Sequence, residues 1–228
     1  MIEKTFQIKM NHEEKQKVNK LFSELSNNPK TLNIKDFGAG SHKLGNERKV
    51  ADIFKTSSSK GKFGRLLFQL MRSYDLKNAL EFGTSLGVGS YHLHLGNPNA
   101  QITTIEACPE TAAFSRNNLA DKTKNIRFVE ATFSDYLAKN ENQQFDLIYV
   151  DGHHDGKALL DYVEKLEAYS HNDTFFLLDD IRWSDSMFDA WNLLRESDKF
   201  HVSIDLFRMG ILVPRKQQQK EHFVLKYS

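Results

Sequence analysis

The feature that most constrains this chain is one short stretch, residues 78–90, with the sequence NALEFGTSLGVGS. A short apolar run leads into Glu81, then come Gly83 and Gly87, and an apolar-patterned segment follows. This order predicts a buried strand, a tight glycine turn and a helix beginning near Ser85. A glycine at the turn permits a positive φ and a close approach of ligand to backbone, and a helix start points free N–H groups at that ligand. The alternative is a plain strand-to-helix turn without a ligand site.

The rest of the chain alternates strand-like and helix-like segments. Further strands are expected at residues 101–105, 126–129, 145–150 and 174–178, with helical patterns between them. The C-terminal part predicts a hairpin over residues 202–213 and a last strand at residues 223–227. Such alternation predicts an α/β fold with a mostly parallel, Rossmann-like sheet, helices on both faces and an antiparallel C-terminal hairpin.

The N-terminal part is expected to be an extension, residues 1–60, in front of a main domain at residues 61–228. Residues 5–8 suggest a short strand or a loose arm. Residues 12–26 predict an amphipathic helix, because apolar residues recur at helical spacing: Val18, Leu21, Phe22 and Leu25. This helix would pack on the main domain or on a second subunit, and the second case would make the protein a homodimer.

Two further segments admit two interpretations each. Residues 36–41, DFGAGS, look like a nucleotide loop, but the segment before them is too polar for a central strand and the segment after them is rich in Lys and Asn. We therefore interpret them as a flexible loop, with a loop that folds over a ligand as the alternative. We interpret residues 56–61, rich in hydroxyl groups, as a solvated loop, with a segment that lines the carboxylate of a bound cofactor as the alternative.

Composition narrows the class of partner and the compartment. The 228 residues have a formal net charge of +1, which gives no basic surplus for nucleic acid. The single cysteine, Cys108, suits a reducing compartment, and the N-terminus lacks the apolar core of a signal peptide. No apolar run approaches the roughly 20 residues that span a bilayer. We expect a cytoplasmic protein that binds neither nucleic acid nor membrane.

Acidic residues end four of the five expected parallel strands. They are Glu81, Glu106, Asp151, Asp179 and Asp180. In open α/β sheets, ligands bind outside the carboxyl ends of the strands. Glu106 lies one βαβ step after Glu81, where an acid accepts both hydroxyls of a ribose. We therefore expect a nucleoside site at this edge of the sheet.

The three aspartates among these residues need compensation, because carboxylates brought together repel one another. We expect Asp151, Asp179 and Asp180 to converge at the mouth of the cleft. The compensating group would be a divalent cation, His154 as imidazolium, Arg182, or a proton. We favour His154, because the sequence DGHH places its imidazole one loop turn from Asp151.

Motif spacing then indicates the cofactor. Gly83, Gly87 and Gly89 are spaced G-x-x-x-G-x-G, which does not fit the G-x-G-x-x-G of dinucleotide-binding folds. The combination of Glu81, Gly83, Gly87 and Glu106 resembles the class I S-adenosylmethionine-dependent methyltransferases, from about residue 61 to the C-terminus.

The match is closest to the small-molecule O-methyltransferase-like branch, whose fourth strand ends D-G-x-H. The stretches EFGTSLG, DDIxWS and IDLFxMG also look like an uncharacterised bacterial group of that branch. The resemblance implies a seven-stranded sheet and methylation of a small-molecule acceptor, at a hydroxyl group. An aminopropyl transferase and a non-catalytic nucleoside-binding domain are the alternatives.

The resemblance also implies site roles. Cofactor contacts would come from Glu81, Gly83, Thr84, Ser85, Gly87, Glu106, Ala107, Ala131, Thr132 and Asp151. Glu106 would hold the ribose, and Thr132 stands where the family often has an acid that accepts the adenine amine. Asp151, His154 and Asp180 would be catalytic, with His154 or its neighbour His153 as the base. Asp151, Asp179 and Asp180 resemble the ligands of metal-dependent catechol-type O-methyltransferases, where Mg²⁺ would lower the pKa of the acceptor hydroxyl.

Overall fold

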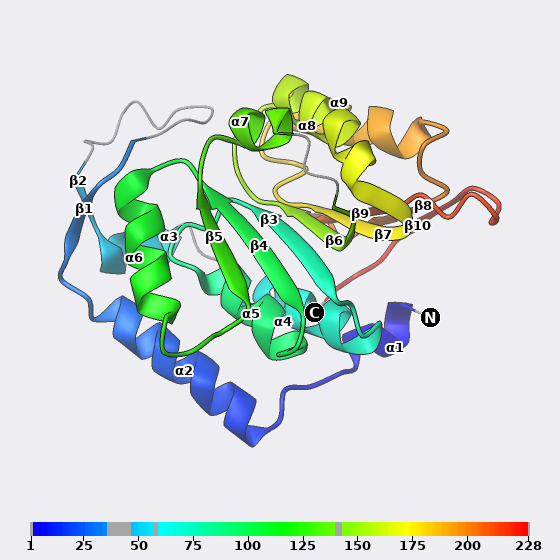
Figure 1. Cartoon of the computed structure of the whole chain (residues 1–228). Helices are drawn as coiled ribbons and strands as arrows, with labels where there is room; N and C mark the ends of the chain where they lie inside the picture. Colours follow the sequence, from blue (N-terminus) through cyan, green and yellow to red (C-terminus); the bar gives the residue numbers. More distant parts are fainter. Residues whose placement is uncertain (1, 36–46, 57–58, 140–142, 228) are drawn as a thin grey trace.

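The computed structural model describes residues 2–35, 47–56, 59–139 and 143–227, and it centres on one twisted sheet (Figure 1). The sheet is built from β3 (Asn78–Phe82), β4 (Gln101–Glu106), β5 (Ile126–Glu130), β6 (Phe145–Val150), β7 (Ser170–Leu178), β8 (Val202–Asp205), β9 (Gly210–Val213) and β10 (Glu221–Val224). The helices that alternate with its strands are α4 (Gly61–Ser73), α5 (Val88–Gly96), α6 (Pro109–Leu119), α7 (Phe133–Ala138), α8 (Gly156–Leu166) and α9 (Asp185–Glu196), and a 3₁₀ turn, η1 (Glu167–Tyr169), precedes β7.

The strand order is β10-β8-β9-β7-β6-β3-β4-β5, and β3, the strand that leads into the glycine turn, lies between β4 and β6. Phe82 at the end of β3 pairs with Ile105 on one side and Val150 on the other, all in parallel register. β9 runs antiparallel to both β7 and β8. This confirms the predicted mostly parallel sheet with an antiparallel C-terminal hairpin. β10 adds an eighth, exposed strand at the edge, parallel to β8.

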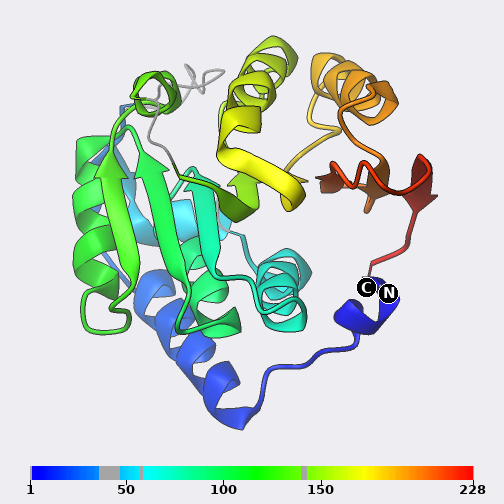
Figure 2. The ribbon, with the colours of Figure 1, turned by 45° about the vertical axis from the view of Figure 1, so that its right-hand side comes forward.

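Helices cover both faces of the sheet (Figures 1 and 2). One face packs against α7, α8 and α9 through a core that includes Tyr136, Tyr162 and Trp191. The other face packs against α4 and α5, with Leu66, Leu70 and Leu93 fully buried. Near-continuous apolar runs such as FDLIYV in β6 are what a strand buried on both faces requires.

The N-terminal segment packs on the same body. α2 (His12–Ser26) begins with a capping box between Asn11 and Glu14, and its buried Leu21 and Leu25 join a cluster with Leu95 of α5. The helix predicted at residues 12–26 is therefore confirmed, and it packs on the main domain. The homodimer and the domain boundary at residue 60 stay predictions.

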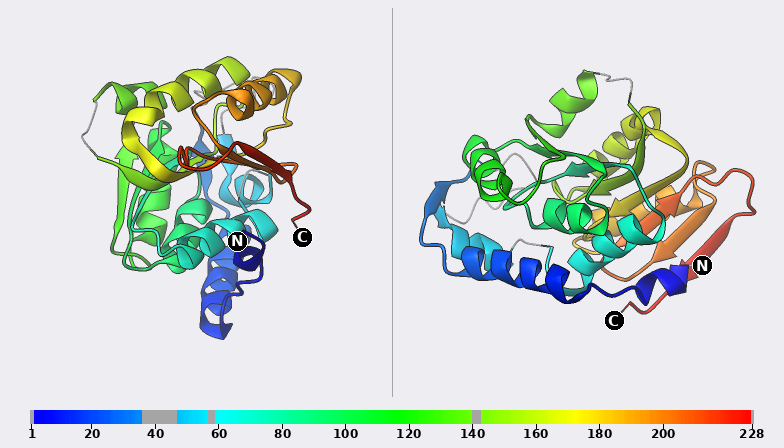
Figure 3. Two further views of the ribbon diagram at one scale, coloured as in Figure 1. Left: turned by 90° about the vertical axis from the view of Figure 1, so that its right-hand side faces the viewer. Right: turned by 60° about the horizontal axis from the view of Figure 1, so that its bottom comes forward.

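Residues 5–8 do not form the expected strand or loose arm. They lie at the end of a short helix, α1 (Ile2–Phe6), which packs against α4. The ring of Phe6 lies 4.7 Å from that of Tyr227, so the two ends of the described chain meet (Figure 3). This contact explains the conformation, because the aromatic side chain is held by the C-terminus rather than by a neighbouring strand.

Three small elements complete the description: β1 (Thr31–Asn33) and β2 (Glu47–Lys49) form a separate antiparallel pair, and α3 (Val50–Thr56) follows them. The loop at residues 36–41 lies outside the described residues. Within the described part of the chain, no helix has the length and apolar character needed to cross a membrane.

Candidate functional site

The turn after β3 brings three strand ends together. Gly83 has a φ of +102°, and a Cβ at this position would lie 1.9 Å from the backbone oxygen of Asp151. On the other side, the Gly83 N–H donates to the carbonyl of Ile105 at 3.0 Å. Any side chain at residue 83 would therefore push β3 and the end of β6 apart. The structure gives Gly83 a packing reason in addition to the close ligand approach expected from the sequence.

Glu81 lies beneath this turn and is 1% exposed. Its carboxylate accepts hydrogen bonds from the hydroxyls of Ser90 and Thr104, the latter at 2.7 Å. Burial raises the pKa of Glu81 to about 7, against the effect of these two hydroxyls. A Cβ at residue 89 would meet a Glu81 oxygen at 2.2 Å, so Gly89 makes room for this carboxylate. In this structure Glu81 braces the turn from inside rather than facing the cleft.

The other residues of the turn also differ in whether they face the interior of the protein or the outside. Thr84 is 3% exposed, and its hydroxyl lies 2.6 Å from that of Thr104. Ser85, with a φ of +47°, is half-buried and turns its N–H outward to Glu106. Gly87 is the N-cap of α5, also with positive φ. Of the predicted cofactor contacts in this turn, the side chain of Thr84 is therefore occupied inside the protein.

Glu106, at the end of β4, faces the turn and is half-buried. One of its oxygens accepts from the N–H of Ser85 at 2.9 Å and the other from the N–H of Cys108 at 2.9 Å. Burial raises its pKa, while these backbone N–H groups and that of Ala107 act in the opposite direction. A carboxylate offers about four lone-pair sites, so each oxygen keeps one for a further donor. Two such sites on one carboxylate suit the two hydroxyls of a ribose.

Residues 131–133 border Glu106 on the far side from Asp151. The N–H of Ala131 donates to the backbone oxygen of Glu106 at 3.1 Å. Thr132 is the N-cap of α7: its hydroxyl accepts from the N–H of Asp135 at 3.1 Å and donates to the Asp135 carboxylate at 2.7 Å. The Thr132 side chain is thus engaged in capping, and the exposed carboxylate of Asp135 is the nearest acid to it.

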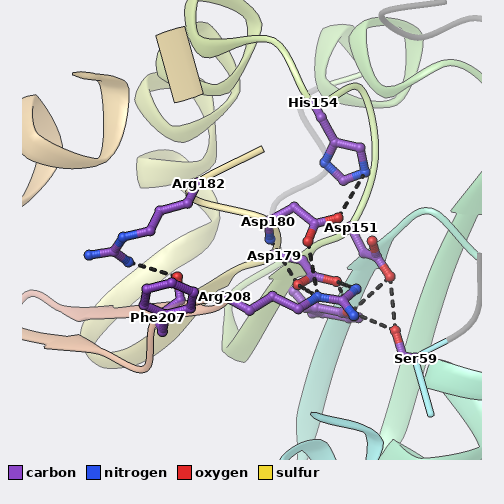
Figure 4. Close-up of polar contacts among 9 residues, drawn as sticks. Ser59, Asp151, His154, Asp179, Asp180, Arg182, Phe207 and Arg208 are labelled. Carbon is purple, nitrogen blue, oxygen red and sulfur yellow. Dashed lines mark hydrogen bonds and ion pairs between the residues drawn. The ribbon is translucent and has the colours of Figure 1, made fainter. Parts of the chain in front are cut away.

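The aspartates predicted to converge do converge (Figure 4). Asp151 accepts from the hydroxyl of Ser59 at 2.9 Å and from that of Tyr149 at 2.8 Å. The Tyr149 hydroxyl is also 3.4 Å from the carboxylate of Asp179. Burial, together with the charges of Asp179 and Asp180, raises the pKa of Asp151 well above its usual range. Ser59 is the residue of the hydroxyl-rich segment before α4 that contacts the cluster.

Arg208 is the cation that compensates the cluster, and sequence reasoning missed it. Its Nε and Nη2 donate to the two oxygens of Asp179 at 2.9 and 2.7 Å, and Nε lies 3.0 Å from Asp180. Burial would lower the pKa of Arg208, but these carboxylates outweigh it and raise the pKa, so the guanidinium stays charged. The only sequence signal was its place as the unspecified residue of the IDLFxMG stretch.

Arg182, which was among the expected compensating groups, points away from the cluster (Figure 4). It forms a two-pronged ion pair with Asp205, at 2.9 and 2.6 Å, and donates to the backbone oxygen of Phe207 at 2.7 Å. The expectation for Arg182 is therefore wrong. Arg182 turns away because the carboxylate of Asp205, only 2% exposed, needs a positively charged partner.

The two adjacent histidines separate into different environments. His153 Nδ1 lies 2.7 Å from the hydroxyl of Tyr162 on α8. His154 Nε2 lies 3.7 Å from Asp180, and its ring is 5.7 Å from that of the exposed Trp183. Only His154 faces the aspartate cluster, which makes it the candidate base of the pair.

The residues do not fit a divalent cation. Both oxygens of Asp179 are taken by the Arg208 guanidinium, on the side where a metal ion shared with Asp180 would bind. Among the described residues, no group of three His, Cys, Asp or Glu side chains has the arrangement of a metal site. The predicted metal ligands come together, and a protein cation lies between two of them.

Comparisons with known proteins agree with this geometry. Residues 80–181 match the family model described as a methyltransferase domain. No curated protein matches the sequence. An O-methyltransferase from Bacillus cereus, solved with S-adenosylhomocysteine, is 16% identical with a TM-score of 0.62, over 90% of this chain and 92% of that one.

Two further structures share the fold. TomG of Streptomyces achromogenes, an O-methyltransferase of tomaymycin synthesis solved with S-adenosylmethionine, is 16% identical with a TM-score of 0.62, over 90% of this chain and 91% of that one. The Podospora anserina methyltransferase PaMTH1, bound to S-adenosylhomocysteine, is 17% identical with a TM-score of 0.58, over 90% and 97%. Residues 80–181 thus match a methyltransferase domain, and the chain has the fold of these S-adenosylmethionine- and S-adenosylhomocysteine-bound methyltransferases.

Proposed function

We propose that this protein binds S-adenosylmethionine at the carboxyl edge of β3, β4 and β6 and methylates a hydroxyl group of a small molecule. One observation carries the proposal: the glycine turn contacts Glu106, the acid expected to bind a ribose, on one side and Asp151 of the aspartate cluster on the other. Ser85 N–H bonds to Glu106, and Gly83 abuts the backbone of Asp151. A nucleoside held by Glu106 would then have its sulfur end directed toward Asp151 and its neighbours.

The residues of the chain divide the work of binding. Glu106 would accept from the ribose hydroxyls, Gly83 and Ser85 would border the methionine part, and Ala131 and Thr132 would border the adenine. The carboxylate of Asp135 is placed beside Thr132 to accept the adenine amine. Glu81 and Thr84 hold the turn from below, through Ser90 and Thr104.

Bound S-adenosylmethionine supplies a methyl carbon already activated by the positive sulfur, so positioning the acceptor in line supplies much of the rate. The acceptor oxygen forms a bond to that carbon as the carbon–sulfur bond breaks, and the hydroxyl proton must leave. His154 accepts it, with Asp180 orienting the imidazole at 3.7 Å. The ring of Trp183, 67% exposed and 5.7 Å from that of His154, would form an apolar wall for a planar acceptor.

The proposal is tested with S-adenosylmethionine labelled in its methyl group and a panel of phenols, catechols and aliphatic alcohols. We expect the label in a methyl ether together with S-adenosylhomocysteine, and loss of turnover in His154→Ala with cofactor affinity retained. His153→Ala is the matched control and should keep turnover. Aminopropyl transfer from a decarboxylated cofactor, with no methyl transfer to any acceptor, would contradict the proposal.

A further inference from the structure

Asp151, Asp179 and Asp180 resemble the metal ligands of catechol-type O-methyltransferases. In this structure Arg208 pairs with two of them, at the place where such a protein would hold a metal ion. Asp179 is 1% exposed, so water cannot screen its charge. Its Oδ1 accepts from Arg208 Nε at 2.9 Å and from the N–H of Asp180 at 2.8 Å, and its Oδ2 accepts from Arg208 Nη2 at 2.7 Å. With the Tyr149 hydroxyl 3.4 Å from Oδ2, a metal ion could reach Asp179 only by displacing a donor.

Arg208 is fixed in this position by its own backbone. It lies in the β8–β9 turn, where its carbonyl accepts from the N–H of Ile181 at 2.9 Å and its N–H donates to Leu206 at 3.0 Å. The same turn is fastened by the pair between Arg182 and Asp205. The guanidinium also lies over the ring of Phe63, 5.2 Å from its centroid. These contacts involve the β8–β9 turn itself, the loop after β7 and α4, which is the arrangement of a built-in group rather than of a freely moving surface side chain.

Part of the Arg208 side chain is still open to a ligand. The Arg208 side chain is 40% exposed, although one edge is bound to Asp179. A guanidinium has five N–H donors in a rigid fork, and the contacts to Asp179 and Asp180 use those of Nε and Nη2. Its remaining N–H groups can donate to an acceptor oxygen that becomes negative as it loses its proton.

We propose that Arg208 takes the place of the divalent cation in this site: its permanent positive charge pairs with Asp179 and Asp180, and its open N–H groups hold the acceptor oxygen. This inference rests on the proposed function, because it concerns the same acceptor site. A metal ion typically coordinates two adjacent oxygens of a catechol, whereas the edge of a guanidinium can hydrogen-bond to a single oxygen. The acceptor class is therefore a compound with a single reacting hydroxyl, with no requirement for a second hydroxyl beside it.

The test uses Mn²⁺ alone as the probe, with binding followed by electron paramagnetic resonance. We expect wild-type protein to bind no Mn²⁺ below about 1 mM, the weak end of protein sites for hard cations. Arg208→Ala and Arg208→Gln should bind Mn²⁺ at least about tenfold more tightly than wild type, because they free the oxygens of Asp179 and Asp180. Arg215→Ala is the matched control: it breaks an ion pair with Asp173 elsewhere, frees one carboxylate only, and should bind as wild type does.

Two outcomes would overturn the inference. One is tight Mn²⁺ binding by wild-type protein that Asp180→Asn abolishes. The other is no gain of Mn²⁺ binding in a folded Arg208 variant, judged by circular dichroism. If both Arg208 variants fail to fold, the wild-type measurement alone decides. Titration of the same samples with S-adenosylhomocysteine separates the two proposals: absence of that binding contradicts the methyltransferase site, whereas Mn²⁺ binding by wild type contradicts only the role of Arg208.

Discussion

At the scale of single residues, the site is shaped by groups that never reach the cleft. Glu81 is a buried carboxylate whose hydroxyl partners, Ser90 and Thr104, come from the following helix and strand. It ties three elements together directly under the cofactor turn. The family resemblance placed it among the residues that contact the cofactor. The sequence of β3 could not correct this, because a strand buried along most of its length lacks the alternation that would tell one face from the other.

The raised pKa of Glu81 predicts a pH dependence of stability. Its pKa is about 7 in the folded protein against a usual 4.5, so folding favours the protonated form. This contribution is complete below about pH 4.5 and is lost as pH rises through 7, at a cost of ~3 kcal/mol. Glu81→Gln should therefore flatten the decline in the free energy of unfolding between these pH values, measured by urea unfolding.

The matched control for this experiment is Glu130→Gln, which changes an exposed acid at the end of β5, two strands away from β3. It should leave the pH profile unchanged. An identical decline in wild type and Glu81→Gln would show that Glu81 is ionised throughout.

Gly83 gives a second prediction at this scale. Gly83→Ala should lower the melting temperature as well as cofactor affinity, because its Cβ would meet the Asp151 carbonyl at 1.9 Å. Gly61→Ala is the matched control: it also has a positive φ, +61°, but no atom within 4 Å of the added Cβ, so only backbone strain of about 1 kcal/mol applies. Equal losses of stability in the two variants, by thermal unfolding, would contradict the close approach of the two backbones.

At the scale of elements, the order of strands and the helix α2 could be predicted, since they depend on local hydrophobic periodicity. The edge that gathers Glu106, Asp151 and Asp179 could also be predicted, since parallel strands end on one side. The identity of the compensating cation could not, because Arg208 reaches the cluster from a hairpin turn. Arg182 lies only two residues after Asp180 in the sequence, yet it points toward Asp205. Closeness in the sequence therefore did not predict which arginine pairs with which aspartate.

The β8–β9 hairpin therefore carries a prediction of its own. Asp205 is 2% exposed, and Arg182 and the Phe207 N–H lower its pKa despite burial. Asp205→Asn should destabilise the fold by about 2 kcal/mol at neutral pH, because it removes the buried partner of the two-pronged ion pair with the half-buried Arg182. The loss should shrink as pH falls through the pKa of Asp205, since protonation removes the same charge in wild type. Urea unfolding at pH 7 and pH 3 measures both.

Asp173→Asn is the matched control for Asp205→Asn, since Asp173 pairs with Arg215 at 57% exposure of its side chain. Its cost should stay below about 1 kcal/mol, as for exposed ion pairs in general. A cost for Asp205→Asn no larger than this would mean that the hairpin is held by its backbone bonds alone.

At the scale of the whole molecule, packing places the proposed cofactor edge on central strands and the proposed acceptor edge on loops beside it. β3, β4 and β6 are central strands paired on both sides, so the turn, Glu106 and Asp151 rest on the most buried part of the sheet. His154 and Trp183 lie in the loops that follow β6 and β7, and Arg208 lies in the β8–β9 hairpin turn. This division lets one cofactor site serve different acceptors when the loops change.

The central claim is that the edge around Glu106 is a cofactor site, and isothermal calorimetry with S-adenosylhomocysteine tests it most directly. Wild-type protein should bind one molecule, Glu106→Gln should bind more weakly by about 1–3 kcal/mol, and Glu130→Gln, one strand away and exposed, should match wild type. No binding by wild-type protein at millimolar ligand, or equal binding by Glu106→Gln, would contradict the account.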